Sequence, residues 1–361
     1  MFIFLKTKKE SSGITVTKIA ATFIGTVIGA GFASGQEVLQ FFGYYQINGF
    51  LGIIVTTILF MVFGYIILKM GWQYQAYSHK EILNKIPGKW LKNILDIVIV
   101  FFLFGAFVTM IAGSGAVFEE QFLINSFWGN IFMILISLLT VLSGVGGVVS
   151  AISIIVPFLI IGIIFMTVMS FLNAFPPGIG TGRSLISRSP VNNWLISAIV
   201  YVSYNIVMAI AILAPLGGEI KEKEKIKPGS ILGGLGLGIG AGLIFFTLIL
   251  NLPDILEYEV PMIYIAGKIS PWAKLLYSFI LLAEIYTTAV GNLFGFVRRI
   301  TGNTRDKYQP VTIITGITAL IFSQMGFSNL VYYLYPVMGY AGFLMIIGIL
   351  IRYYKDKKIL R

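Results

Sequence analysis

A chain of 361 residues that is 57% hydrophobic and only 11% charged is too apolar for a soluble surface and too long for a single membrane span. Its formal net charge of +11 does not indicate a nucleic-acid partner, because the basic residues lie in short connections between apolar segments, where membrane insertion explains them. We therefore expect an all-α integral membrane protein that is surrounded by a lipid bilayer.

Apolar runs long enough to cross a bilayer, roughly 20 residues each, recur ten times along the chain. They predict ten transmembrane helices that form a single transmembrane domain over residues 1–361. The ten segments are 17–44, 48–70, 92–117, 127–144, 147–172, 191–217, 230–252, 272–297, 309–325 and 328–352.

The first segment contains a run that an uninterrupted bilayer helix should not have. Residues Ile28 to Glu37 include three glycines, a serine and a carboxylate. In hydrocarbon an unpaired backbone group is costly, so irregular backbone occurs at membrane depth only where it is buried in protein or lines a watery cavity. The run therefore predicts a break in the first helix and a binding site at that break. Close packing of the same glycines against a neighbouring helix is the alternative.

The distribution of lysine and arginine predicts the orientation of the chain. All but four of the 26 basic residues fall on one side of the ten segments, the exceptions being Arg183, Arg188, Lys268 and Lys274. Because cytoplasmic loops carry most basic residues, we expect both termini in the cytoplasm. The long connection from Pro253 to Ser270 would then lie outside, where it could fold back over the outer face as a lid.

Dividing the chain at its polar segment, residues 173–193, leaves five predicted spans on each side. An odd number places the two halves in opposite orientations, as in transporters built from inverted repeats. Repeat A covers residues 17–172 and repeat B covers residues 191–352. Helix 6, the counterpart of helix 1, should then also be discontinuous, and it has a polar cluster from Tyr201 to Asn205 at mid-span.

The sequence Gly-Ala-Gly-Phe-Ala-Ser-Gly-Gln-Glu at residues 29–37 resembles the signature of the YkvI-type bacterial membrane proteins, and the likeness extends over nearly the whole chain. More distantly, Gly29 to Phe32 and the loop from Gly218 to Pro228 are similar to the amino acid–polyamine–organocation superfamily. The resemblance implies the LeuT fold, with a 5+5 inverted repeat and discontinuous helices 1 and 6. It also implies a bacterial cytoplasmic membrane as the location.

In that fold, backbone amides at the helix 1 break hold the carboxylate of the substrate, and helix 6 faces it. An anion also suits the start of a helix on physical grounds, because unpaired amides and the positive end of the dipole lie there. The substrate-binding residues expected on this basis are Ala30, Gly31, Phe32, Ala33, Ser34, Glu37, Tyr201, Ser203, Tyr204 and Asn205.

Helix 8 contains a carboxylate and two hydroxyls, Glu284, Thr287 and Thr288, which resemble the sodium-binding hydroxyls of LeuT-fold symporters. The resemblance adds the carbonyls of Gly25 and Ile28 as further ligands, and oxygen ligands suit a hard cation. Glu284 could instead carry a proton, because an acid at mid-membrane is costly when ionised and unpaired. The structural alternatives are threonines bonded to their own helix and a protonated glutamic acid bonded to a neighbour. Apart from a sodium ion or proton, no cofactor is expected.

Three other features have mainly structural interpretations. Asp96 is expected to cap a helix or to pair with a basic residue at an inner gate. The glycines between Gly233 and Gly242 are expected to permit tight helix packing. The tyrosines between Tyr332 and Tyr340 suit the membrane interface, although one of them could gate a cavity.

These features predict a secondary active transporter, a symporter that moves a small amino-acid-like solute with sodium or protons by alternating access. A ligand-sensing receptor subunit of the same fold, without net transport, is the alternative, and a passive channel is a third interpretation. An enzyme is not expected, because the chain has no cysteine, a single histidine and no metal-ligand cluster. The sequence does not specify the oligomeric state.

Overall fold

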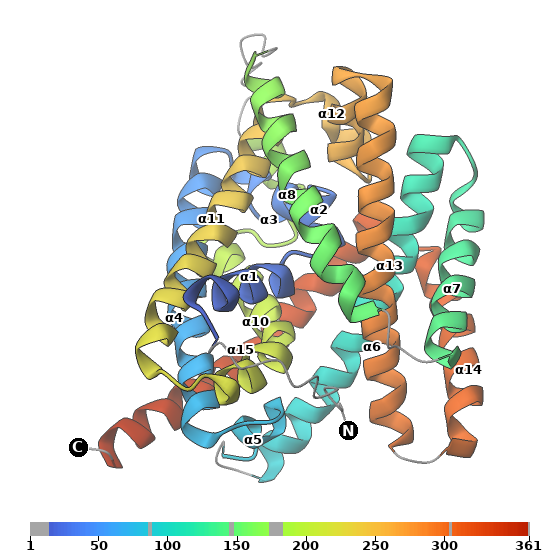
Figure 1. Ribbon diagram of the computed structural model, residues 1–361. Coiled ribbons are helices and arrows are strands. Elements are labelled where there is room, and N and C mark those ends of the chain that lie inside the picture. The colour runs from blue at the N-terminus through green and yellow to red at the C-terminus, as the bar shows by residue number, and fades with distance from the viewer. Residues whose placement is uncertain (1–13, 86–88, 144–147, 173–182, 303–304, 360–361) are drawn as a thin grey trace.

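The computed structural model describes residues 14–85, 89–143, 148–172, 183–302 and 305–359, and within these ranges the chain is helical and has no strand (Figure 1). The predicted locations of both termini and part of the predicted 173–193 boundary lie outside the described residues. The helices are α1 Val16–Val27, α2 Ala30–Ala33, α3 Gln36–Phe41, α4 Ile47–Tyr74, α5 His79–Leu83, α6 Lys89–Phe122, α7 Ser126–Ser143, α8 Val148–Leu172, α9 Arg183–Ile186, α10 Trp194–Glu219, α11 Ile226–Leu250, α12 Pro261–Ile269, α13 Pro271–Thr301, α14 Arg305–Ser323 and α15 Phe327–Ile359.

Within the described residues, seven helices are long and apolar enough to cross a membrane, namely α4, α6, α7, α10, α11, α13 and α15. Two shorter apolar stretches, Val16–Val27 in α1 and Pro157–Leu172 in α8, accompany them. Many of the large apolar side chains on these helices are exposed, such as Ile58 and Leu139. Because water would not tolerate so many exposed apolar side chains, these faces lie against lipid and the chain is an integral membrane protein.

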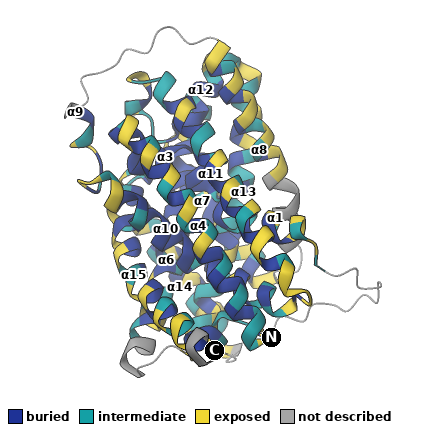
Figure 2. Cartoon of the chain, turned by 90° about the vertical axis from the view of Figure 1, so that its left-hand side faces the viewer, coloured by how far each residue is buried: buried dark blue, intermediate teal, exposed yellow. Residues whose placement is uncertain are grey.

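Helix α10 lies at the centre of the bundle. About two thirds of its apolar window is buried, 67%, against 33% for the peripheral α7. It packs against α4, α15 and α1. Figure 2 shows the same distribution, with buried positions gathered on the inner helices and exposed positions on the outward faces. The helix that was expected to face the helix 1 break therefore has the largest buried share of the seven candidate spans.

Glycines allow α4 and α10 to cross with their backbones in contact. A Cβ atom on Gly71 would overlap the carbonyl oxygen of Ala214, and one on Gly217 would overlap the carbonyl oxygen of Leu68. The Cα atom of each glycine lies within about 3.2 Å of the Cβ position of the other. Small residues at helix crossings let backbones approach in this way where lipid supplies no hydrophobic driving force.

Most of the glycines of α11 have the packing role predicted for them. On one face Gly229, Gly233 and Gly236 lie against the side chains of Ile19, Phe23 and Ile24 of α1. On another face Gly234 and Gly238 lie against Met61 and Thr57 of α4. This confirms the packing role for Gly233, Gly234, Gly236 and Gly238, whereas a Cβ on Gly242 would have no atom within 4 Å. The contacts also place α1 beside α11 (Figure 1).

The predicted interruption of helix 6 is wrong, because α10 is a single α-helix from Trp194 to Glu219. Two polar side chains of its mid-span cluster bond to their own backbone. The Ser203 hydroxyl donates to the carbonyl oxygen of Ile199 at 2.7 Å, and Asn205 Nδ2 donates to that of Tyr201 at 3.0 Å. Because these groups find partners one turn back, and no glycine or proline stands between Tyr201 and Met208, nothing opens the helix there.

Residues 253–270 fold back onto the segment between α2 and α3, and their role as a lid over the outer face stays a prediction. They form a 3₁₀ turn at Asp254–Glu257 followed by α12. The backbone amide of Met262, in the first turn of α12, donates to the carbonyl oxygen of Ser34 at 3.1 Å. A Cβ on Gly35, whose φ of +81° suits glycine, would meet the Met262 side chain at 2.8 Å. The lid helix α12 therefore rests directly on the segment between α2 and α3.

Candidate functional site

The first apolar segment is divided into three short helices. Helix α1 ends at Val27, Ile28 and Gly29 are extended with ψ of 109° and −177°, and α2 begins at Ala30. Glycine has a low helix propensity, and four glycines stand between residues 25 and 35. Among the described residues, the amides of Ala30, Gly31 and Phe32 have no hydrogen-bond acceptor. At Ile28–Gly29 the C-terminal end of α1 therefore meets the N-terminal end of α2, whose first amides are free.

The other polar groups of this segment bond locally. The Ser34 hydroxyl donates to the Gly31 carbonyl at 2.7 Å and accepts from the amide of Gln36 at 3.2 Å. The carbonyl oxygen of Ala33 accepts a hydrogen bond of 2.6 Å from the Tyr277 hydroxyl of α13. Ser34 thus fixes the turn between α2 and α3. Its side chain has local partners, whereas the amides of the predicted cradle do not.

Glu37 links the broken segment to α10. Its carboxylate oxygen Oε2 accepts a 2.5 Å hydrogen bond from the Tyr204 hydroxyl, and its Oε1 lies against the Cα side of Gly31. The side chain is buried, with 6% exposed, and no ion pair involves it in the described part of the chain. A buried carboxylate without a cationic partner is costly. This acid is therefore available to a positively charged group that enters from elsewhere.

Aromatic rings surround this hydrogen bond. The Tyr204 ring lies 5.0 Å from the ring of Tyr335 and 5.4 Å from that of Tyr201, and Phe41 contacts both Tyr201 and Tyr204. The hydroxyl of Tyr201 is buried and has no hydrogen-bond partner among the described residues. Faces of aromatic rings attract cations, so this cluster of Tyr201, Tyr204 and Tyr335 beside Glu37 suits an ammonium group.

The predicted substrate-binding residues separate into two groups. Glu37, Gly31, Tyr201 and Tyr204 lie together. Ser203 lies elsewhere, because its backbone carbonyl packs against Gly342 of α15 and its hydroxyl bonds within α10. Tyr335 was assigned by sequence to the tyrosines of the membrane interface, yet it is buried in the cluster. Only knowledge of which face of α15 meets α10 would have separated it from its neighbours.

The predicted coupling residues of helix 8 lie on α13. Glu284 is buried, with 2% exposed, and its Oε2 atom has no hydrogen-bond partner among the described residues. Thr287 is also buried, and its hydroxyl donates to the carbonyl of Glu284 at 3.0 Å. Thr288 is half-buried. Gly25 and Ile28 lie in and after the last turn of α1. Of these residues, Glu284 is the one that a structural role does not explain, because its buried Oε2 atom has no partner among the described residues.

Two carboxylates hold the lid helix at its base. Glu120, near the end of α6, accepts hydrogen bonds through Oε1 from the amides of Glu259 at 2.6 Å and Val260 at 3.1 Å. Glu259 in turn accepts from the amide of Phe327, at the start of α15, at 3.0 Å. Lys274 donates to the carbonyl of Glu120 at 2.7 Å. Sequence analysis missed these residues, because only the tertiary fold brings the acids to the starts of α12 and α15.

Replacing Glu259 by glutamine is expected to stabilise the protein at neutral pH. Burial raises the pKa of Glu259, and the hydrogen bond from Phe327 opposes this only in part. The pKa of Glu259 is therefore higher in the folded protein than in the unfolded chain. As the pH rises through the folded-state pKa, Glu259 ionises and the free energy of unfolding falls. Glu259→Gln keeps an acceptor without the charge, so Tm should rise by roughly 1–3 °C at neutral pH. The gain should vanish in acid, where Glu259 is already neutral. Glu257→Gln, on the exposed side of the same loop, is the matched control.

Comparison with known proteins gives two relatives along the full chain. The uncharacterized membrane protein YkvI of Bacillus subtilis is 31% identical over 342 residues, which cover 95% of this chain and 97% of YkvI. The chain belongs to the YkvI family. The YyaD protein of the same organism is 29% identical over 328 residues, 91% of this chain and 94% of YyaD. No protein-family model matches the chain.

Solved structures similar to this YkvI-family chain are LeuT-fold transporters. MhsT in complex with L-phenylalanine superposes with a TM-score of 0.61 at 16% identity, covering 90% of this chain and 87% of MhsT. The inward-facing conformation of Mhp1 gives a TM-score of 0.58 at 14% identity, covering 85% of this chain and 70% of Mhp1. A manganese transporter of Eremococcus coleocola also gives a TM-score of 0.58 at 14% identity, covering 94% of this chain and 78% of the transporter. These likenesses show the fold. The proteins in question are transporters rather than enzymes, which agrees with the expectation that the chain is not an enzyme.

Proposed function

We propose that this YkvI-family protein is a secondary active transporter that moves a small zwitterionic, amino-acid-like solute with sodium or protons. Ten helices cross the membrane in this proposal, as two inverted repeats of five with both termini in the cytoplasm. The observation that carries it is the buried contact between Glu37 of the broken first segment and Tyr204 of the central helix α10. That contact joins a break in one predicted repeat to the centre of the other, which is where inverted-repeat transporters bind their substrates.

The two ends of an amino acid match the two sides of the break. Its carboxylate would accept hydrogen bonds from the free amides of Ala30, Gly31 and Phe32, at the positive end of α2. Its ammonium group would replace the Tyr204 hydroxyl as the partner of Glu37, against the rings of Tyr201 and Tyr335. A neutral amino acid satisfies both groups without leaving a buried charge unpaired.

A thermal-shift screen of the purified protein against the common amino acids tests this proposal. A solute that binds only the folded state stabilises it by RT ln(1 + [L]/Kd), so Tm rises with the logarithm of the solute concentration once that concentration exceeds Kd. We expect at least one neutral amino acid to raise Tm, and the corresponding amine and carboxylic acid, each lacking one charged group, to do so far less. A protein that none of these solutes stabilises, in sodium or potassium and at two pH values, contradicts the proposal.

Replacing Glu284 by glutamine is expected to remove the ion dependence of solute binding. An unpaired carboxylate within the membrane requires a proton or a cation, at a cost of several kcal/mol when neither is present. If Glu284 supplies the coupling charge, the solute-induced Tm shift of the wild type should differ between sodium and potassium or between the two pH values. Glu284→Gln should give the same shift in all four conditions.

Glu119→Gln provides the matched control, because the same substitution is made at an exposed acid near the end of α6. It should keep the ion dependence of the wild type. A Glu284→Gln variant that retains that dependence would assign Glu284 a structural role, as an acid bonded within the bundle.

A further inference from the structure

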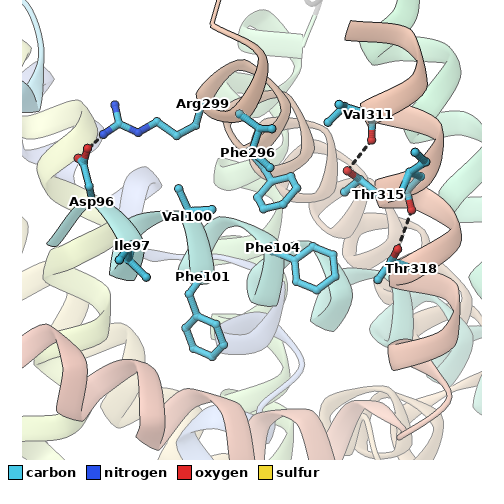
Figure 3. A pocket seen from close by; sticks show the side chains of 12 residues that line it. Asp96, Ile97, Val100, Phe101, Phe104, Phe296, Arg299, Val311, Thr315 and Thr318 are labelled. Atoms are coloured by element: carbon cyan, nitrogen blue, oxygen red, sulfur yellow. Dashed lines mark hydrogen bonds and ion pairs between the residues drawn. The ribbon is translucent and has the colours of Figure 1, made fainter. Parts of the chain in front are cut away.

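A groove lies between α6, α13 and α14, on the periphery of the bundle and away from the Glu37 cluster (Figure 3). Its volume of about 690 Å³ falls within the range of small-molecule sites, roughly 300–1,000 Å³. Of the residues named above, only Asp96 lines it. The proposed transport site therefore does not account for this groove.

The wall of the groove is apolar and faces outward. Ile97 and Phe101 of α6, Ile300 of α13 and Ile314 of α14 line it, and they are 69%, 40%, 51% and 61% exposed. Ile97 and Phe101 belong to an apolar stretch long enough to cross the membrane. Apolar side chains exposed on such a stretch contact lipid chains. Phe104 ends this wall, with its ring 5.3 Å from that of Phe296 (Figure 3).

One end of the groove is charged. Asp96 forms an ion pair with Arg299, as expected for an acid that meets a basic residue near the inner face. The pair is partly accessible, with 55% of the Asp96 side chain and 22% of the Arg299 side chain exposed. Arg298 lies beside it, with its guanidinium 5.0 Å from the ring centre of Tyr308. Both arginines stand in the last turn of α13, so the charged end is at the membrane surface.

We propose that this groove binds a membrane phospholipid, with an acyl chain along the apolar wall and the phosphate at Arg299. The groove is apolar along its length and ends in a guanidinium group at the membrane surface. A phospholipid is complementary to it, because its acyl chain is apolar and ends in a phosphate at the same depth. The planar guanidinium group suits phosphate, because it can donate two parallel hydrogen bonds. Asp96 holds Arg299 across the groove mouth, where it also offers a carboxylate to a headgroup amine.

Native mass spectrometry of the purified full chain tests the proposal, with a phosphatidylethanolamine as the probe and a diacylglycerol of the same acyl chains for comparison. We expect one molecule of the phospholipid to bind per chain, and the diacylglycerol to bind at least fivefold less. Ile314→Trp should fill the groove and reduce bound phospholipid at least fivefold. Ile317→Trp is the matched control, because Ile317 is 58% exposed on the same helix and does not line the groove.

The double variant Asp96→Asn with Arg299→Gln removes both charges of the pair together, so neither is left unpaired. It should reduce the preference for phospholipid over diacylglycerol while the chain remains folded, as judged by its Tm. Equal lipid binding by Ile314→Trp and Ile317→Trp would overturn the proposal. So would equal binding of the two lipids by the wild type. Loss of an oligomer in Ile314→Trp alone would show instead that a second copy of the chain fills the groove.

Discussion

Replacing Gly31 by alanine is expected to weaken amino-acid binding more than tenfold while the protein stays folded. A Cβ atom at position 31 would overlap the carboxylate of Glu37. Because that carboxylate is the end of a flexible side chain, it can rotate away, but it then leaves the position beside Tyr204 where it would accept a hydrogen bond from the ammonium group of the amino acid. A lost hydrogen bond to a charged group weakens binding by about 1.5–3 kcal/mol, which is more than tenfold in Kd.

The measurement is the Tm shift produced by the amino acid that stabilises the wild type most. Gly31→Ala should need a more than tenfold higher concentration of the amino acid to give the same shift, with a Tm in the absence of solute close to that of the wild type. Gly291→Ala is the control, since a Cβ there has no atom within 4 Å and the position is exposed on α13. A Gly31→Ala variant that binds the same amino acid with unchanged affinity would remove the break in the first segment from the site.

Replacing Gly217 by alanine is expected to destabilise the protein more than any other single change considered above. The new Cβ would overlap the carbonyl oxygen of Leu68 and lie 3.1 Å from the Cα of Gly71. These are backbone atoms of the packed α4–α10 pair, near the C-terminal ends of both helices, so the helices must move apart there to make room for the new atom. Overpacking of this kind costs about 1–3 kcal/mol, and more where the backbone must move.

Gly242→Ala separates this clash from the general effect of alanine in a helix. Both substitutions gain up to about 1 kcal/mol of helix propensity, but a Cβ on Gly242 has no atom within 4 Å. Gly217→Ala should lower Tm by several degrees or prevent isolation of a monodisperse protein, whereas Gly242→Ala should leave Tm unchanged or slightly higher. Equal Tm values for the two variants would mean that α4 and α10 do not cross with their backbones in contact.

The two expected helix breaks show what a sequence can and cannot predict. Around Gly29 the chain has two glycines, Gly29 and Gly31, within three residues, and the structure ends α1 just before them, at Val27. In α10 the only signal was polarity, and polarity does not break a helix when Ser203 and Asn205 can donate to carbonyls one turn back. The glycines therefore predicted where the backbone leaves the helix. The polar residues of α10 predicted only which side chains form hydrogen bonds.

Residues that depend on tertiary contacts could not be predicted in the same way. Glu37 and Tyr204 were both expected near the site, but their hydrogen bond depends on how deeply α3 lies beside α10. Tyr335 has the same local sequence features as Tyr332 and Tyr333, and only the packing of α15 buries it. The acids at the base of the lid, Glu120 and Glu259, bond to backbone amides that are remote in sequence. No local pattern contains such pairings.

Uptake into sealed proteoliposomes tests the central claim most directly, because it distinguishes a transporter from a sensor with the same fold. The substrate would be the radiolabelled amino acid that gives the largest Tm shift, with a sodium or proton gradient imposed across the membrane. The account predicts accumulation above the external concentration, driven by one of the two gradients and reduced in Gly31→Ala. Binding of that amino acid without uptake under either gradient would contradict transport and would favour a ligand-sensing receptor subunit.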